Sequence, residues 1–305
     1  MFSIITSCPA CGHTLESATG TICPYCRTLL PVPAEAQPST SNPETSSSPW
    51  LDLFWAFLIW GISGAFLLGL DAAFRLALWL MHKPIPQVEI TRGLAILSLI
   101  LTFVMQLAAM AGSWMYVTRF GKKPFLRTLG WRWHTQFRWV HAVALAALMY
   151  GVAILLSKLL PHRETELEKV LKLGLLVRVM VVMLAVLAAP IVEEVVYRGV
   201  VYSAAEQLGG KAFGVGLVTF VFALVHVPQY WGSVVAITTI VVLSFTLTLL
   251  RAWTDSLLPC VAMHFVYNGV QGVFLLFAPD KALESAPKET ASTVITVISR
   301  WCGLN

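Results

Sequence analysis

Apolar residues in this chain form long runs that are interrupted by charge at only a few places. Five runs contain no Asp, Glu, Lys or Arg: residues 53–70, 93–118, 139–157, 212–250 and 256–279. A membrane-spanning helix needs about 20 apolar residues, and the longest run predicts two spans because residues 228–232 break it. A further apolar segment, 173–192, ends at a pair of glutamates. The pattern predicts an all-α polytopic transmembrane bundle of seven spans, or eight if the first run is split or the tail after Pro279 adds one.

The composition indicates that lipid is the solvent for most of the chain. Of the 305 residues, 57% are hydrophobic and 12% are charged, and the mean hydropathy is +0.74. Soluble domains carry about 25% charged residues, so a soluble enzyme with a single core is excluded. The aromatic share of 11% also excludes a disordered chain.

The first 30 residues differ from the rest because they are rich in cysteine and have too few apolar residues for a core. Each of two C-x-x-C pairs forms a tight turn that aims two thiolates at one point, and four thiolates complete the tetrahedral shell of Zn²⁺. Residues 1–30 are therefore predicted to form a zinc ribbon with a structural Zn²⁺, and the alternative is two redox dithiols or cysteines without a shared role. The predicted ligands are Cys8, Cys11, Cys23 and Cys26.

The segment that follows the cysteines is predicted to be a flexible linker. Residues 31–49 contain five Pro and five Ser without apolar periodicity, a composition typical of disordered tethers. Arg27 is the only basic residue in 1–30, whereas nucleic-acid affinity depends on several phosphate contacts. The ribbon is therefore expected to bind a protein partner and no nucleic acid.

The distribution of basic residues predicts the orientation in the membrane. The loop between the second and third spans carries six basic residues and no acidic one, and cytoplasmic loops are enriched in Lys and Arg. Counting back two spans places the N-terminus on the same side, where the reducing cytosol suits a thiolate zinc site. The six residues are Arg119, Lys122, Lys123, Arg127, Arg132 and Arg138.

A few ionisable and strongly polar side chains lie inside the apolar segments. A charge at mid-depth in a membrane costs at least about 2.5–3.5 kcal/mol, so an ionisable residue there indicates a functional site. Helical spacing places three pairs on shared faces, because residues four apart are neighbours on a helix. These pairs are Glu194 with Arg198, Phe222 with His226, and His264 with Asn268, and Glu193 lies about 100° away from Glu194.

Two of these residues are expected to lie at the same depth. If residues 206–211 form the turn between two antiparallel helices, Glu193 and His226 each lie about sixteen residues, or roughly 25 Å, from it. A carboxylate and a neutral imidazole that share a buried water can activate it, with the carboxylate as general base. His264 and Asn268 can donate to a developing oxyanion. The set predicts hydrolysis of an amide.

The same residues resemble three motifs of the CPBP family, which contains the type II CAAX prenyl endopeptidases and bacterial abortive-infection and bacteriocin-immunity-like membrane proteins. The motifs are EEVVYRG from Glu193, FALVH ending at His226, and HFVYN from His264, and the similarity covers about 173–279. It implies a glutamate-type intramembrane protease that needs no catalytic metal and cleaves a peptide or membrane-protein substrate in the bacterial inner membrane. In that scheme Glu193 and His226 activate water, Glu194 and Arg198 support the first carboxylate, and His264 and Asn268 form the oxyanion hole.

The predicted organisation is a ribbon (1–30), a linker (31–49), a transmembrane protease-like domain (50–279) and a tail (280–305). Two alternatives stay open. One is a non-catalytic membrane scaffold or immunity-type protein that recruits a partner through the ribbon. The other is a zinc-dependent intramembrane protease, because one Glu and two His form a possible ligand set, although the chain has no H-E-x-x-H motif.

Overall fold

A computed structural model describes residues 12–13, 48–61, 76–82, 90–160 and 163–277. The chain divides into two units, Met1–Ser47 and Ser48–Asn305. The four ribbon cysteines, nearly all of the linker and the tail lie outside the described residues, so the zinc ribbon stays a prediction.

The described part of the second unit is helical and contains no strand. Two stretches of one long helix, labelled η2 and η3, have π-helical hydrogen bonding. In chain order the elements are α1 (Pro49–Trp60), α3 (Arg92–Thr118), α4 (Phe125–Thr128), α5 (Trp139–Leu159), α6 (Glu166–Leu171), α7 (Leu175–Met183), η2 (Leu184–Ala188), α8 (Ala189–Glu193), η3 (Glu194–Val201), α9 (Tyr202–His226), α10 (Val234–Thr254) and α11 (Leu258–Phe277).

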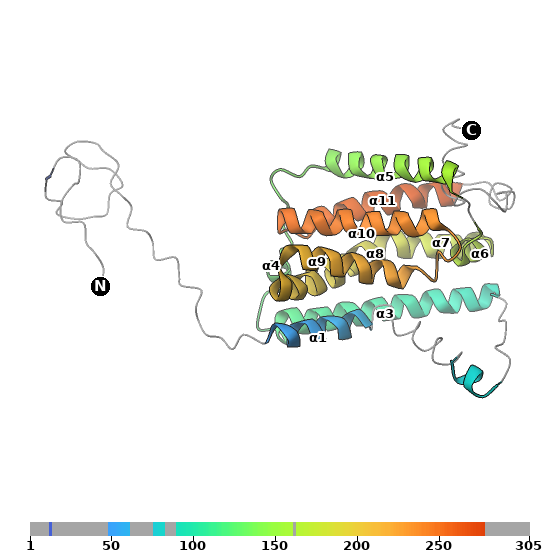
Figure 1. The fold of residues 1–305 in the computed structure, drawn as a ribbon, viewed down its shortest axis with the longest axis horizontal. Helices are drawn as coiled ribbons and strands as arrows, with labels where there is room; N and C mark the ends of the chain where they lie inside the picture. The colour runs from blue at the N-terminus through green and yellow to red at the C-terminus, as the bar shows by residue number, and fades with distance from the viewer. Residues whose placement is uncertain (1–11, 14–47, 62–75, 83–89, 161–162, 278–305) are drawn as a thin grey trace. The chain divides into compact units, whose positions relative to one another are not determined.

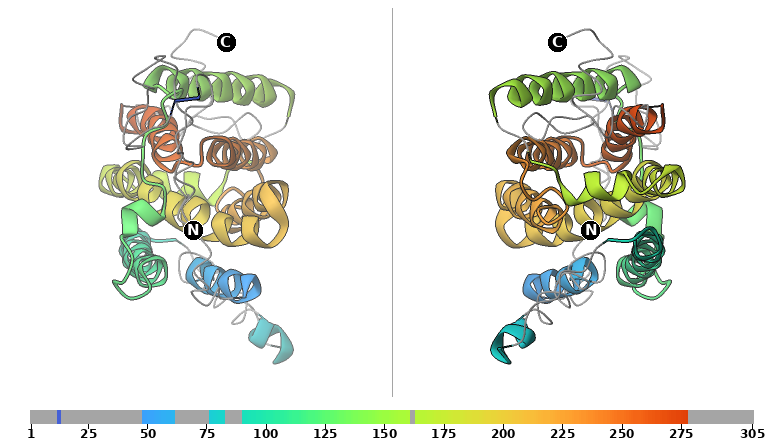
Figure 2. Two further views of the ribbon diagram at one scale, coloured as in Figure 1. Left: turned by 90° about the vertical axis from the view of Figure 1, so that its left-hand side faces the viewer. Right: turned by 90° about the vertical axis from the view of Figure 1, so that its right-hand side faces the viewer.

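The long helices run side by side (Figure 1), and the end-on views of Figure 2 show their order. The helix α5 lies on one side of the bundle and packs on α10 and α11, which in turn cover α9 and the α7–η3 helix, while α1 and α3 lie on the far side. The α7–η3 helix is therefore enclosed between α3 and α11. This helix carries both glutamates of the first motif.

A helical hairpin joins the first two motifs, as the sequence predicts. Gly210 breaks the helix with φ 78° and ψ 178°, a conformation that glycine adopts without steric cost. Beyond this break the chain runs back along itself, because the rings of Tyr197 and Phe222 lie 4.9 Å apart and a Cβ at Gly214 would lie 2.9 Å from the Tyr202 ring. Glu193 precedes Tyr197 by four residues and His226 follows Phe222 by four, so both lie on the same side of this contact.

Five helices in the described part of the chain are long and apolar enough to cross a membrane. They are Arg92–Thr118, Trp139–Leu159, Leu175–His226, Val234–Thr254 and Leu258–Phe277. Leu175–His226 contains both arms of the hairpin, and the first predicted span is described only over α1. The chain is a multi-pass membrane protein, and the total of seven or eight spans stays a prediction.

Candidate functional site

The helix that carries the glutamates is irregular next to Pro190, and Asn268 compensates for this irregularity. In η2 the amide of Ala189 donates to Leu184 O, a π-helical i+5 bond. If the same i+5 register continued, the amide of residue 190 would donate to Ala185 O. Residue 190 is a proline, which has no N–H. Asn268 Nδ2 of α11 supplies the missing donor, at 2.8 Å from Ala185 O. Asn268 therefore ties α11 to the bend that precedes Glu193.

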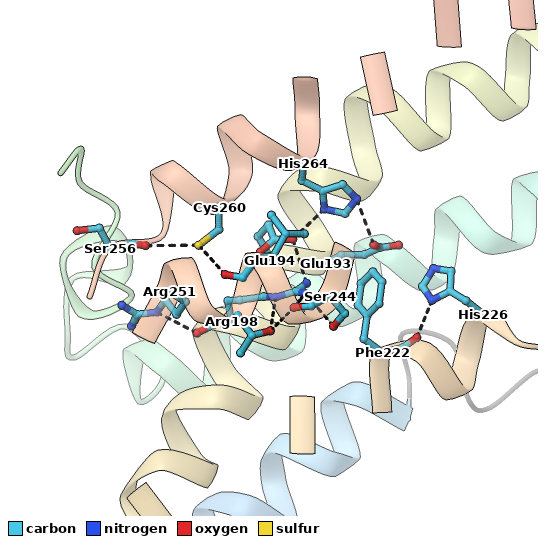
Figure 3. Close-up of polar contacts among 12 residues, drawn as sticks. Glu193, Glu194, Arg198, Phe222, His226, Ser244, Arg251, Ser256, Cys260 and His264 are labelled. Carbon is cyan, nitrogen blue, oxygen red and sulfur yellow. Dashed lines mark hydrogen bonds and ion pairs between the residues drawn. The ribbon is translucent and has the colours of Figure 1, made fainter. Parts of the chain in front are cut away.

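Glu194 and Arg198 form an ion pair that is closed to solvent, which confirms the predicted i,i+4 contact. Arg198 Nη1 donates to Glu194 Oε1 at 3.0 Å, and both side chains are 0% exposed. Two other guanidinium nitrogens donate to α10: Nη2 donates to Ser244 (Figure 3), and Nε donates to Thr248 Oγ1. Because its charge and most of its donors are satisfied, this pair holds η3 against α10.

His264 connects the buried pair to the first glutamate of the motif. Its Nδ1 lies 2.8 Å from Glu194 Oε1, and its Nε2 lies 3.9 Å from Glu193 Oε2 (Figure 3). A carboxylate only accepts, so Nδ1 carries the proton of that bond. The sequence predicts His264 as an oxyanion donor, and its position on Glu194 adds a supporting contact that the motif spacing does not reveal. To donate to an oxyanion as well, the ring must carry a second proton on Nε2.

His226 is held in one tautomer by its own helix. Its Nδ1 lies 2.7 Å from Phe222 O, and its ring stacks on the Phe222 ring with centroids 4.5 Å apart. Because a carbonyl only accepts, Nδ1 is the protonated nitrogen and Nε2 is left as the basic one. The ring of Phe222 also contacts His264, with centroids 6.4 Å apart. Phe222 thus spaces the two imidazoles.

Four of the six predicted site residues line a single cavity. Glu193, His226, His264 and Asn268 all border a space of about 380 Å³. Glu193 is half-buried, at 20% side-chain exposure, whereas Glu194 and Arg198 lie behind the wall and do not reach the space. The structure gives no direct contact between Glu193 and His226. The geometry leaves room for a small molecule such as water beside Glu193.

Sequence reasoning missed Tyr230, which also lines this cavity. Its backbone belongs to the turn after α9, where its amide donates to the carbonyls of His226 and Val227. Burial, followed by the negative charges of Glu193 and Glu168, raises the pKa of Tyr230 to about 12. The phenol therefore stays protonated at neutral pH and can donate a hydrogen bond. A tyrosine four residues after the motif histidine is the only signal of it in the sequence.

The cavity lies toward one end of the bundle. Glu166 and Leu167 of α6 and Gln229 of the turn after α9 line it, and the amide of Leu167 donates to Gln229 O. Figure 1 shows α6 at the opposite end of the bundle from α4, which lies within the basic loop. The cavity is therefore on the far side from the basic loop.

No group of three or more His, Cys, Asp or Glu side chains within the described ranges is arranged to hold a metal ion. The imidazole of His264 is already directed at two carboxylates through both ring nitrogens. Cys260, the free cysteine that the structure describes, is buried and donates to Leu247 O at 3.4 Å.

We expect Asn268→Ala to lower the free energy of unfolding by about 1–3 kcal/mol, because Ala185 O then loses its donor. Thermal unfolding of the full chain in detergent, followed by circular dichroism, measures this loss. Gln271→Ala is the matched control, because Gln271 lines the same cavity one turn along α11 and should leave the melting temperature nearly unchanged. Equal melting temperatures for wild type and Asn268→Ala would show that the bond to Ala185 contributes nothing.

One family model matches this chain, Type II CAAX prenyl endopeptidase Rce1-like, over residues 175–270. The matched segment begins at α7 and contains all three motifs. It supports the CPBP relationship and, at a coarse level, a hydrolase. Neither the curated proteins nor the solved structures that were compared give a match.

Proposed function

We propose that this protein is an intramembrane endopeptidase that hydrolyses a peptide bond with a water activated by Glu193 and His226. One observation carries the proposal: both side chains border one cavity, together with His264 and Asn268. The match to a protease family over 175–270 supports the same reaction class.

In the proposed reaction, Glu193 takes a proton from a water positioned by His226 Nε2, and the water oxygen attacks the scissile carbonyl carbon. The carbonyl oxygen gains negative charge, which the second amide proton of Asn268 and a doubly protonated His264 would stabilise. When the C–N bond breaks, Glu193 passes its proton to the leaving amine. Glu194 and Arg198 would act one layer behind, by fixing His264.

The position of the cavity indicates on which side of the membrane the scissile bond of the substrate lies. The basic loop is expected to be cytoplasmic, and the cavity lies toward the other end of the bundle. We therefore propose a membrane-bound peptide or membrane-protein segment whose scissile bond lies on the outer side, rather than a cytosolic C-a-a-X tail. The ribbon, with one Zn²⁺ on Cys8, Cys11, Cys23 and Cys26, would recruit a protein partner on the cytoplasmic side.

Metal removal separates the glutamate mechanism from the zinc-dependent alternative. The test uses full-length protein carrying Cys8→Ser and Cys23→Ser, in which a catalytic metal would be the only zinc left to remove. We expect 1,10-phenanthroline to leave the cleavage of a fluorogenic membrane-anchored peptide in proteoliposomes unchanged. Activity that disappears with the chelator and returns with added Zn²⁺ would instead support the metalloprotease.

A further inference from the structure

A second cavity lies away from the proposed active site, at the end of the bundle that carries the basic loop. It has a volume of about 490 Å³ and is lined by Arg127, Thr128, Gly130, Trp131, Arg132, Arg251 and Asp255. Arg251 lies in the last turn of α10 and Asp255 directly after it. The cavity therefore lies at the end of a helix that is long and apolar enough to cross a membrane.

The three arginines of this cavity lack a carboxylate partner in the part of the chain that the structure describes. Arg251 is only 8% exposed, and its Nε donates to a neutral acceptor, Arg198 O, at 3.2 Å. Arg132 Nε donates to Ser256 Oγ at 3.4 Å (Figure 3 shows Arg251 and Ser256). Asp255, the acidic residue of the lining, pairs with Lys211 at 3.4 Å instead. The cavity thus holds an excess of positive charge.

The absence of a side chain at Gly130 leaves room for the guanidinium group of Arg251. Gly130 has φ +70°, and a Cβ there would lie 3.0 Å from Asp255 O and 3.7 Å from Arg251 Nη1. The amide of Leu257 donates to Gly130 O at 2.9 Å, which fastens the basic loop to the α10–α11 connection. The arginines of the loop and of α10 are therefore brought together by the fold and not by sequence proximity.

We propose that this cavity binds the phosphate group of an anionic phospholipid. Guanidinium forks match phosphate oxygens, and basic pockets between helices at the cytoplasmic surface bind anionic head groups. Trp131 in the lining is a residue type that concentrates at the membrane–water interface. A bound phosphate would offset the charge of the buried Arg251, whose Nε donates to Arg198 O in the helix that holds the buried Glu194 pair.

The proposal is tested by binding, independently of proteolysis. Full-length protein is placed in nanodiscs of dioleoylphosphatidylcholine with increasing dioleoylphosphatidylglycerol, and retained lipid is counted by native mass spectrometry. We expect one phosphatidylglycerol to be retained per chain. Arg127→Gln with Arg132→Gln, both exposed positions, should weaken this retention by about fivefold per arginine.

The control carries the same charge change outside the cavity. Lys122→Gln with Arg138→Gln lies on the same loop but not in the lining, and should leave retention within about twofold of wild type. Equal loss in both double variants, or equal retention of phosphatidylcholine, would overturn the proposal. Displacement of the retained lipid by millimolar inorganic phosphate would also overturn it, because free phosphate would then be the ligand.

Discussion

Glu193→Gln should reduce the rate of peptide hydrolysis by about 10³-fold, within the 10²–10⁴-fold range of general acid–base catalysis. The amide has the shape of the carboxyl group but cannot take a proton from water at neutral pH. The substitution should leave the fold intact, because the Glu193 side chain is 20% exposed and its carboxylate lies 3.9 Å from His264 Nε2, beyond the length of a hydrogen bond. Cleavage of the anchored peptide in proteoliposomes measures the rate, and circular dichroism checks the fold.

A second carboxylate of the cavity provides the matched control. Glu166 lines the same space but pairs with Lys169 at 2.7 Å, and both side chains are 48% exposed. Glu166→Gln should therefore keep a rate close to wild type. A full rate in Glu193→Gln would remove the catalytic assignment. A cellular phenotype that survives Glu193→Gln but needs the ribbon would instead support a membrane scaffold.

Arg198→Met should destabilise the folded protein by about 3–5 kcal/mol, because the buried carboxylate of Glu194 then loses its ion pair with the guanidinium and keeps only the contact with His264 Nδ1. Both side chains are 0% exposed, so water cannot replace the lost contact. The double variant Glu194→Gln with Arg198→Met should be more stable than Arg198→Met alone, since it removes the unpaired charge. Reversible unfolding of the full chain in mixed micelles measures both differences.

An exposed ion pair gives the comparison for this effect. Lys169→Met removes the partner of Glu166, at a site where solvent screens both charges, and should cost less than about 1 kcal/mol. If Arg198→Met and Lys169→Met destabilise the protein equally, the buried pair does not support the site. If the double variant is less stable than Arg198→Met, the unpaired carboxylate is not the cause of the loss.

The sequence predicts the parts of the site that depend on local spacing. Residues four apart share a helix face, so the contact of Glu194 with Arg198 and the stacking of Phe222 on His226 follow from the pattern and are present. The depth argument assumes a turn at 206–211, and Gly210 breaks the helix there. These features need only the geometry of single helices and one short connection.

The contacts between helices could not be predicted in the same way. Asn268 donates to Ala185 O, a carbonyl that the π-helical register and Pro190 together leave without a backbone donor. Neither the asparagine nor the proline, taken alone in the sequence, indicates this bond. His264 reaches Glu194 only because α11 packs on the helix of the glutamates. The approach of Arg251 to Gly130 likewise depends on how the basic loop folds back on α10.

The most direct test of the central claim is a kinetic double-mutant cycle on Glu193 and His226. Glu193→Gln is combined with His226→Asn, whose amide can keep the hydrogen bond that Nδ1 makes to Phe222 O while removing the basic Nε2. If both groups act on one water, each single variant should lose most of the activity and the double variant should be no slower than the slower single variant. Losses that multiply in the double variant would show that the two side chains act on different steps and would contradict the account.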